Sequence, residues 1–136
     1  MKTSELTGAA LDWAVAKCEG VTDEWREDGP FLWNGVPCVR CGGHDVNYRP
    51  STEWYLAGPI IDREDIAISS APDGLWAAYA SKGTRLVQHG GQAVEVFNWT
   101  FKQEGYTPLI AAMRCYVASK LGDEIELPKE LNHENT

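Results

Sequence analysis

A run of potential metal ligands lies near the middle of the chain. Cys38 and Cys41 form a Cys-X-X-Cys pair, and two glycines separate this pair from His44. Such a turn can present two thiolates to one zinc ion, because glycine relieves the strained backbone. A structural zinc site needs four ligands, however, and the sequence contains no second half-site. Cys18 and Cys115 fall at apolar positions of predicted helices and are typical of small core residues. We therefore expect no bound metal and two reduced thiols in a loop.

Local catalytic motifs are missing from the sequence. Gly42-Gly43 and Gly90-Gly91 belong to neither of the common glycine-rich phosphate-binding patterns, and no HExxH or GxSxG motif occurs. His44, His89 and His133 lie in separate turn-like or terminal contexts. We expect no catalytic residues, no cofactor and no enzymatic activity.

Arg114 is the most informative candidate for ligand binding. A helical wheel places it beside Ile110, Ala118 and Leu121, on a largely apolar helix. A guanidinium group cannot lose its charge, so its burial requires carboxylate, phosphate or several carbonyl partners. One interpretation is a structural ion pair, for example with Asp12. The other is an anion-binding residue at the edge of a pocket.

A second candidate site is the segment Arg-Pro-Ser-Thr-Glu-Trp. Pro50 favours an extended conformation at Arg49. Ser51 and Thr52 offer hydroxyl and amide groups, and Trp54 offers a flat apolar face. Together they can hold a small polar ligand by hydrogen bonding and stacking. The alternative is that Ser51 or Thr52 caps a short helical turn over a buried Trp54.

Two helices and an antiparallel sheet are predicted to position these residues. The first helix covers residues 7–18, with Thr7 as N-cap and apolar residues at helical spacing. The last covers residues 107–121, where Thr107-Pro108 begins the helix and Gly122 ends it. Between them, apolar runs separated by turn residues, with the first turn at Pro72, predict a meander over residues 66–101. Its strands are expected at 66–69, 75–79, 85–88 and 93–101.

The remaining segments are predicted to be irregular. Residues 21–50 suggest loops with at most short strands, and Asn34-Gly35 suits a tight hairpin. Gly58-Pro59 predicts a break in the chain. We expect one α+β domain over residues 1–136, an antiparallel meander packed with the N-terminal and C-terminal helices. Its polar tail, from about residue 132, is expected to be frayed.

Composition and charge exclude several classes of function. The net charge of −8 comes without a basic stripe, so neither general nucleic-acid binding nor binding to anionic membranes is expected. The acidic residues are scattered, which favours a solvated surface over a mimic of DNA. The sequence has no signal peptide and no apolar run of about 20 residues, so we expect a cytoplasmic protein. Six tryptophans can fill the core or line a stacking surface.

The predicted last helix also bears on oligomerisation. It is apolar almost all round, so it needs two covering layers, of which the predicted sheet supplies one. Either the first helix or a second subunit must supply the other. We therefore expect a homodimer as one possible assembly.

Four motifs resemble a phage-encoded family of small proteins of unknown function, the NinX-like proteins. They are TSELTGAALDWAVAKCEG at 3–20, PSTEW at 50–54, GPIID at 58–62 and TPLIAAMRCYVASKLGDEIELP at 107–128. Residues 24–48, with their Cys-X-X-Cys pair, do not take part in the resemblance. The family supplies no established catalytic residues. The resemblance implies a phage accessory protein acting in the cytoplasm of the bacterial host.

Small phage accessory proteins often disarm host defence, an association that says little about chemistry. The function we expect is non-enzymatic sequestration of a small nucleotide-like signalling molecule. Arg114 and the Ser51 and Thr52 amides would bind phosphate while Trp54 stacks on the base, with Arg49 in the same site. The alternative is a protein that inhibits a host enzyme through an acidic, Trp-rich surface. A signal-degrading enzyme is the third interpretation.

Overall fold

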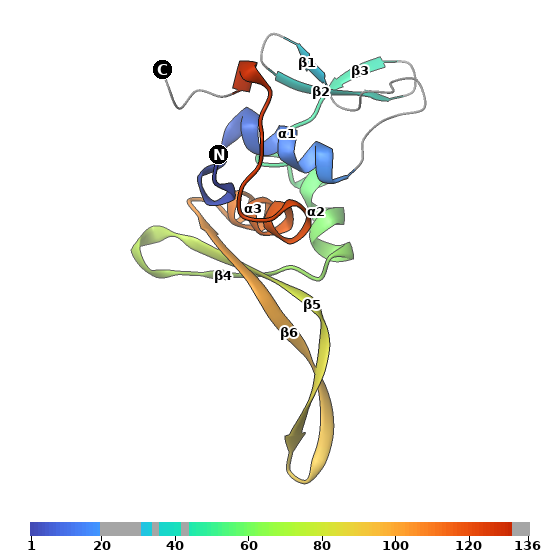
Figure 1. Ribbon diagram of the computed structural model, residues 1–136, viewed down its shortest axis with the longest axis vertical. Coiled ribbons are helices and arrows are strands. Elements are labelled where there is room, and N and C mark those ends of the chain that lie inside the picture. Colours follow the sequence, from blue (N-terminus) through green and yellow to red (C-terminus); the bar gives the residue numbers. More distant parts are fainter. Residues whose placement is uncertain (20–30, 34–35, 42–43, 132–136) are drawn as a thin grey trace.

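The computed structural model describes residues 1–19, 31–33, 36–41 and 44–131. Two antiparallel sheets flank a helical centre (Figure 1). The smaller sheet consists of β1 (Phe31–Trp33), β2 (Val36–Cys41) and β3 (His44–Asn47), and the larger of β4 (Ala67–Ser70), β5 (Trp76–His89) and β6 (Gln92–Gly105). The helices are α1 (Gly8–Cys18), α2 (Trp54–Arg63) and α3 (Pro108–Leu121), with 3₁₀ turns η1 (Thr3–Glu5), η2 (Pro72–Gly74) and η3 (Lys129–Leu131). The predicted α+β class with an antiparallel sheet is confirmed: α3 packs directly on the large sheet, and α1 packs on α3 and on β2.

Helix α3 forms the centre of the molecule. The Thr107 hydroxyl accepts a hydrogen bond from the Ile110 amide at 3.1 Å, and Gly122 ends the helix at a φ of 90°. The predicted cap and terminator are therefore confirmed. Its residues from Leu109 to Ala118 are buried, except for half-buried Ile110. The large sheet covers one side and α1, α2 and η1 cover others. Because one chain covers α3, this helix gives no reason to expect a dimer.

Helix α1 and the small sheet complete the layers. The backbone carbonyl of Thr7 accepts from the Leu11 amide at 3.3 Å, and Leu6 and Leu11 are both fully buried, as expected for the predicted start of the helix. The small sheet contacts α1 through β2. Trp33 pairs with Val36, which is the strand pairing of the predicted hairpin, although residues 34–35 themselves lie outside the described residues, as does the tail after residue 131.

Helix α2 contradicts the predicted break at Gly58-Pro59. The helix runs from Trp54 to Arg63 with Pro59 inside it. A proline in a helix interior costs about 3 kcal/mol, because it lacks an N–H donor and its ring crowds the preceding turn. Burial of Ala57 and Ile60 against the core offsets this cost. Tertiary packing has therefore overridden the local signal.

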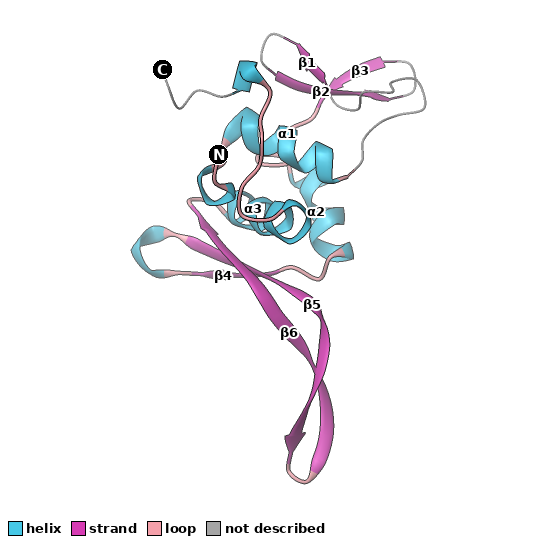
Figure 2. Ribbon diagram, viewed as in Figure 1, coloured by secondary structure: helices cyan, strands magenta, loops and turns pink. Residues whose placement is uncertain are grey.

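Strands β5 and β6 form a hairpin much longer than the predicted meander strands. The sequence suggested separate strands near residues 75–79 and 85–88. The structure joins them into one strand of 14 residues, with register irregularities between Ala80 and Thr84. Figure 2 shows the distal part of this hairpin extending away from the helices. The short β4 pairs only with the proximal part of β5, from Trp76 to Tyr79.

Candidate functional site

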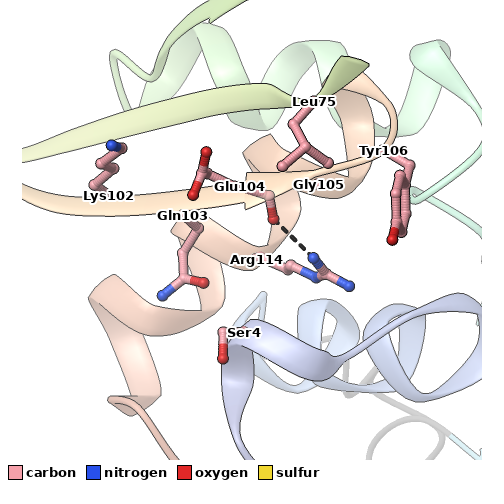
Figure 3. A pocket seen from close by; sticks show the side chains of 8 residues that line it. All are labelled: Ser4, Leu75, Lys102, Gln103, Glu104, Gly105, Tyr106 and Arg114. Atoms are coloured by element: carbon pink, nitrogen blue, oxygen red, sulfur yellow. Dashed lines mark hydrogen bonds between the residues drawn. The ribbon is translucent and has the colours of Figure 1, made fainter. Parts of the chain in front are cut away.

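A pocket of about 560 Å³ lies where the end of β6 meets η1 and α3. Figure 3 shows its lining, which consists of Ser4, Leu75, Lys102, Gln103, Glu104, Gly105, Tyr106 and Arg114. Gln103, Ser4 and Arg114 lie on one side of β6, whereas Lys102 and the Glu104 carboxylate lie on the other. The side chains on the Arg114 side of β6 thus include an amide, from Gln103, and a hydroxyl, from Ser4.

Arg114 is buried, with 8% of its surface exposed, and it is held by main-chain carbonyls. Its Nε donates to the Leu6 carbonyl at 2.8 Å, and its Nη1 donates to the Glu104 carbonyl at 2.7 Å (Figure 3). No described carboxylate forms an ion pair with it, and Nη2 has no hydrogen-bond partner within the described part of the chain. The predicted ion pair with Asp12 is wrong, because Asp12 accepts a hydrogen bond from the Ser51 amide instead.

The electrostatic consequence is a positive charge that no described carboxylate pairs with. Burial lowers the pKa of the Arg114 guanidinium below its ordinary value, yet arginine remains charged at any physiological pH. Carbonyl dipoles satisfy two of its donors without neutralising the charge. An anion beside Nη2 would neutralise this charge and accept a hydrogen bond from it.

Two local features bring the carbonyl groups to Arg114. A Cβ atom on Gly105 would lie 2.7 Å from Ile110 Cγ2 and 2.8 Å from the Ala111 amide nitrogen, so only glycine lets β6 approach α3 this closely. On the other side, the Thr3 hydroxyl donates to the Gly122 carbonyl at 2.7 Å. This bond fixes η1 against the end of α3 and places the Leu6 carbonyl beside the guanidinium.

Tyr106 is the exposed aromatic side chain of the pocket. It connects β6 to the cap of α3, its ring lies beside the Arg114 guanidinium, and 76% of its surface is exposed. Sequence reasoning overlooked Tyr106, as well as Gln103 and Ser4. The position of Tyr106 in the sequence could have indicated its exposure. It directly precedes the Thr-Pro start of the last helix, and side chains at such a junction between a strand and a helix are accessible.

The other predicted site residues lie elsewhere and do not line the Arg114 pocket. The Ser51 amide donates to Asp12 Oδ1 at 2.8 Å, and the Thr52 amide donates to the Arg49 carbonyl at 3.1 Å. The idea that these two amides are free for phosphate is therefore wrong. Arg49 instead pairs with Glu53 at 3.0 Å, on the surface.

The alternative interpretation, in which Ser51 or Thr52 caps a helical turn over a buried Trp54, does not agree with the structure either. Trp54 is 57% exposed at the start of α2, and the N-cap residue, Glu53, makes no side-chain cap. The Ser51 hydroxyl is buried and has no hydrogen-bond partner among the described residues. Next to it, burial raises the pKa of the Asp12 carboxyl to about 6, although the hydrogen bond from Ser51 opposes the shift.

The Cys-X-X-Cys segment adopts a strand rather than the predicted loop. Cys38 lies on β2, where it is buried and its Sγ donates to Asn47 Oδ1 at 3.5 Å. No group of three potential metal ligands occurs in the ranges that the structure describes. The side chains of Cys41 and His44 lie outside the described residues, so the absence of zinc stays a prediction.

Comparison with known proteins supports the resemblance drawn from the motifs. No helix of the described residues is long and apolar enough to cross a membrane. No curated protein matches the chain. The family described as Bacteriophage P22, NinX, matches residues 2–120, a span that contains Arg114 and the whole lining of its pocket. The chain therefore belongs to this phage family.

Proposed function

We propose that this chain is a phage accessory protein that binds and sequesters a small anionic, nucleotide-like signalling molecule of host defence, in the bacterial cytoplasm. The observation that carries the proposal is the buried guanidinium of Arg114. It lacks a carboxylate partner among the described residues, and it borders a pocket of about 560 Å³. This volume lies within the usual range of small-molecule sites, about 300–1,000 Å³.

The pocket offers complementary groups for both parts of such a ligand. A phosphate oxygen would accept from Arg114 Nη2, with the Gln103 amide and the Ser4 hydroxyl as further donors. A base would stack on the exposed ring of Tyr106. Tyr106 thus takes the role that the sequence suggested for Trp54. The net charge of −8 does not oppose this binding, because the local field of a site can differ in sign from the whole molecule.

Sequestration fits the pocket better than catalysis. A nucleophile needs an adjacent base that is itself oriented. Among the described lining residues, the hydroxyl of Ser4 has no histidine beside it, and Lys102 and Glu104 lie on the far side of β6. A signal-degrading activity therefore has no evident nucleophile and base in this site.

One experiment distinguishes binding from degradation. The protein is incubated with a panel of nucleoside phosphates and cyclic dinucleotides, separated from free ligand, and then heat-denatured. We expect one of these compounds to be recovered intact from the wild-type protein. Recovery of an altered compound would indicate an enzyme, and no retention of any compound would refute the proposal.

Two variants locate the binding in this pocket. Tyr106→Ala removes an exposed ring without disturbing the core and should weaken binding by about 10- to 100-fold, the usual value of one stacked base. Trp54→Ala removes a similarly exposed ring outside the pocket and should leave binding unchanged. The reverse pattern would place the ligand at the start of α2 instead.

A further inference from the structure

The charges around the Arg114 pocket determine how much negative charge its ligand can carry. The charged residues of the lining are Lys102, Glu104 and Arg114. Lys102 and the Glu104 carboxylate lie together on the far side of β6, where their charges offset each other (Figure 3). Among the described lining residues, Arg114 is thus the one cation on its own side of the strand. An anion bound on that side meets a single positive charge.

The donors of Arg114 are also limited to one place. Its Nε and Nη1 donate to the Leu6 and Glu104 carbonyls at 2.8 Å and 2.7 Å, which holds the guanidinium in a fixed position. Only 8% of the residue's surface is exposed, and Nη2 has no hydrogen-bond partner within the described part of the chain. A fixed guanidinium of this kind suits the oxygens of one phosphate group and cannot follow a chain of several.

The charge of a phosphate group depends on how it is esterified. A phosphodiester carries one negative charge. A terminal phosphate carries about −1.5 to −2 at neutral pH, because its second pKa is about 6. Arg114 balances the first, but part of the second would remain without a cation, in a chain whose net charge is already −8. Sites for nucleoside triphosphates meet the larger charge with additional cations.

The aromatic part of the pocket also indicates a small ligand unit. Tyr106 supplies the one ring of the lining, and this ring lies beside the guanidinium (Figure 3). It is 76% exposed and can stack on one base. The Gln103 amide, on the same side of β6 as Arg114, offers both a donor and an acceptor. The pocket therefore has groups for one base and one adjacent phosphate.

We propose that this pocket takes a nucleotide whose phosphate is a diester, as in a cyclic nucleotide, and discriminates against the terminal phosphate of the ring-opened product. The inference rests on the proposed function, since it names the ligand class of the same pocket. Such discrimination would keep the site free for the intact signal, because ring-opened products would not compete for it.

The first test is calorimetric titration of the full wild-type chain with matched compounds. The probes are the cyclic monophosphates of adenosine, guanosine, cytidine and uridine and the cyclic dinucleotides of adenosine and guanosine. Each is compared with its ring-opened form, which has a terminal phosphate, and with ATP and GTP. We expect at least one cyclic compound to bind about 10-fold or more tightly than its ring-opened form and than the triphosphates. Equal or tighter binding of a ring-opened form or a triphosphate would overturn this inference and leave the proposed function standing. Binding of none of the probes would overturn both.

The second test changes the charge of the pocket. Gln103→Lys places a second cation on the Arg114 side of β6. It should strengthen binding of the ring-opened form about 10-fold relative to the cyclic form and so remove the preference. Gln88→Lys makes the same change in net charge at an exposed position on the distal part of β5, and it should keep the preference. Melting curves establish that both variants are folded.

Three results of the second test would overturn the inference. They are a preference that Gln103→Lys leaves unchanged, a preference that Gln88→Lys removes equally, and loss of both ligand forms in Gln103→Lys. In each case, the local charge beside Arg114 would not decide which phosphate binds.

Discussion

Replacement of Arg114 by alanine tests what the buried guanidinium contributes to folding and to binding. The substitution removes the two hydrogen bonds that join the Leu6 and Glu104 carbonyls to α3. Hydrogen bonds from charged donors contribute about 1.5–3 kcal/mol each, so the pair contributes about 3–6 kcal/mol. The substitution also removes a buried charge whose desolvation costs several kcal/mol.

The two effects oppose each other, and we expect a net loss of about 1–3 kcal/mol in the free energy of unfolding. For a domain of this size, this loss corresponds to a fall in Tm of about 3–12 °C. The assay is thermal unfolding followed by circular dichroism, with and without the retained nucleotide. A ligand at 100 times its Kd stabilises the wild type by about 2.7 kcal/mol, and this ligand-dependent stabilisation should vanish in the variant.

A control and a second variant separate the two roles of Arg114. Arg49→Ala removes an exposed ion pair with Glu53 and should change stability by only about 0–1 kcal/mol, without affecting ligand-dependent stabilisation. Arg114→Lys keeps the charge but not the forked donor geometry, so it should retain part of the binding. The reasoning is refuted if Arg114→Ala has the same Tm as the wild type and is stabilised by ligand to the same extent. Arg114 would then neither stabilise the contacts of α3 with Leu6 and Glu104 nor bind the anion.

Three further predictions test the reasoning on packing and burial. Gly105→Ala should cost about 1–3 kcal/mol, because its Cβ would overlap Ile110 and the α3 backbone, whereas Gly58→Ala, with open space around it in α2, should stabilise by about 0.5–1 kcal/mol. The wild type should lose stability as pH rises from about 4 to about 6, because the pKa of Asp12 is higher in the folded state than in the unfolded state and ionisation therefore disfavours folding. Asp12→Asn should abolish this pH dependence. Burial raises the pKa of the Cys115 thiol to about 12, so alkylation at pH 8 should label Cys115 only after denaturation.

Each of these predictions has a direct measurement. Urea unfolding compares the two glycine variants, and equal midpoints would contradict the close approach of β6 to α3. Unfolding at a series of pH values compares Asp12→Asn with the wild type. Parallel pH profiles would mean that burial does not raise the pKa of the Asp12 carboxyl. Mass spectrometry reads the alkylation, and rapid labelling of Cys115 in the folded protein would contradict its burial in the core.

Elements with local signals could be predicted from the amino-acid sequence. The helix at residues 108–121 follows from Thr107, Pro108 and Gly122, which satisfy or terminate backbone hydrogen bonds within one turn. The fold class and the turn at Pro72 follow in the same way from spacing and turn chemistry. The family resemblance used the same terminal motifs, and it is confirmed over residues 2–120.

Contacts between groups that are distant in the sequence could not be predicted and became known from the folded chain. The donors of Arg114 could have met a carboxylate, an anion or carbonyls, and the Leu6 carbonyl that accepts one of them is 108 residues away along the chain. Helix α2 passes through Pro59 because core packing outweighs a local penalty. Ser51 turns inward to Asp12, which separates it from Arg114. Local propensity fixes dihedral angles over a few residues, whereas a binding site depends on contacts between segments that become neighbours only when the chain folds.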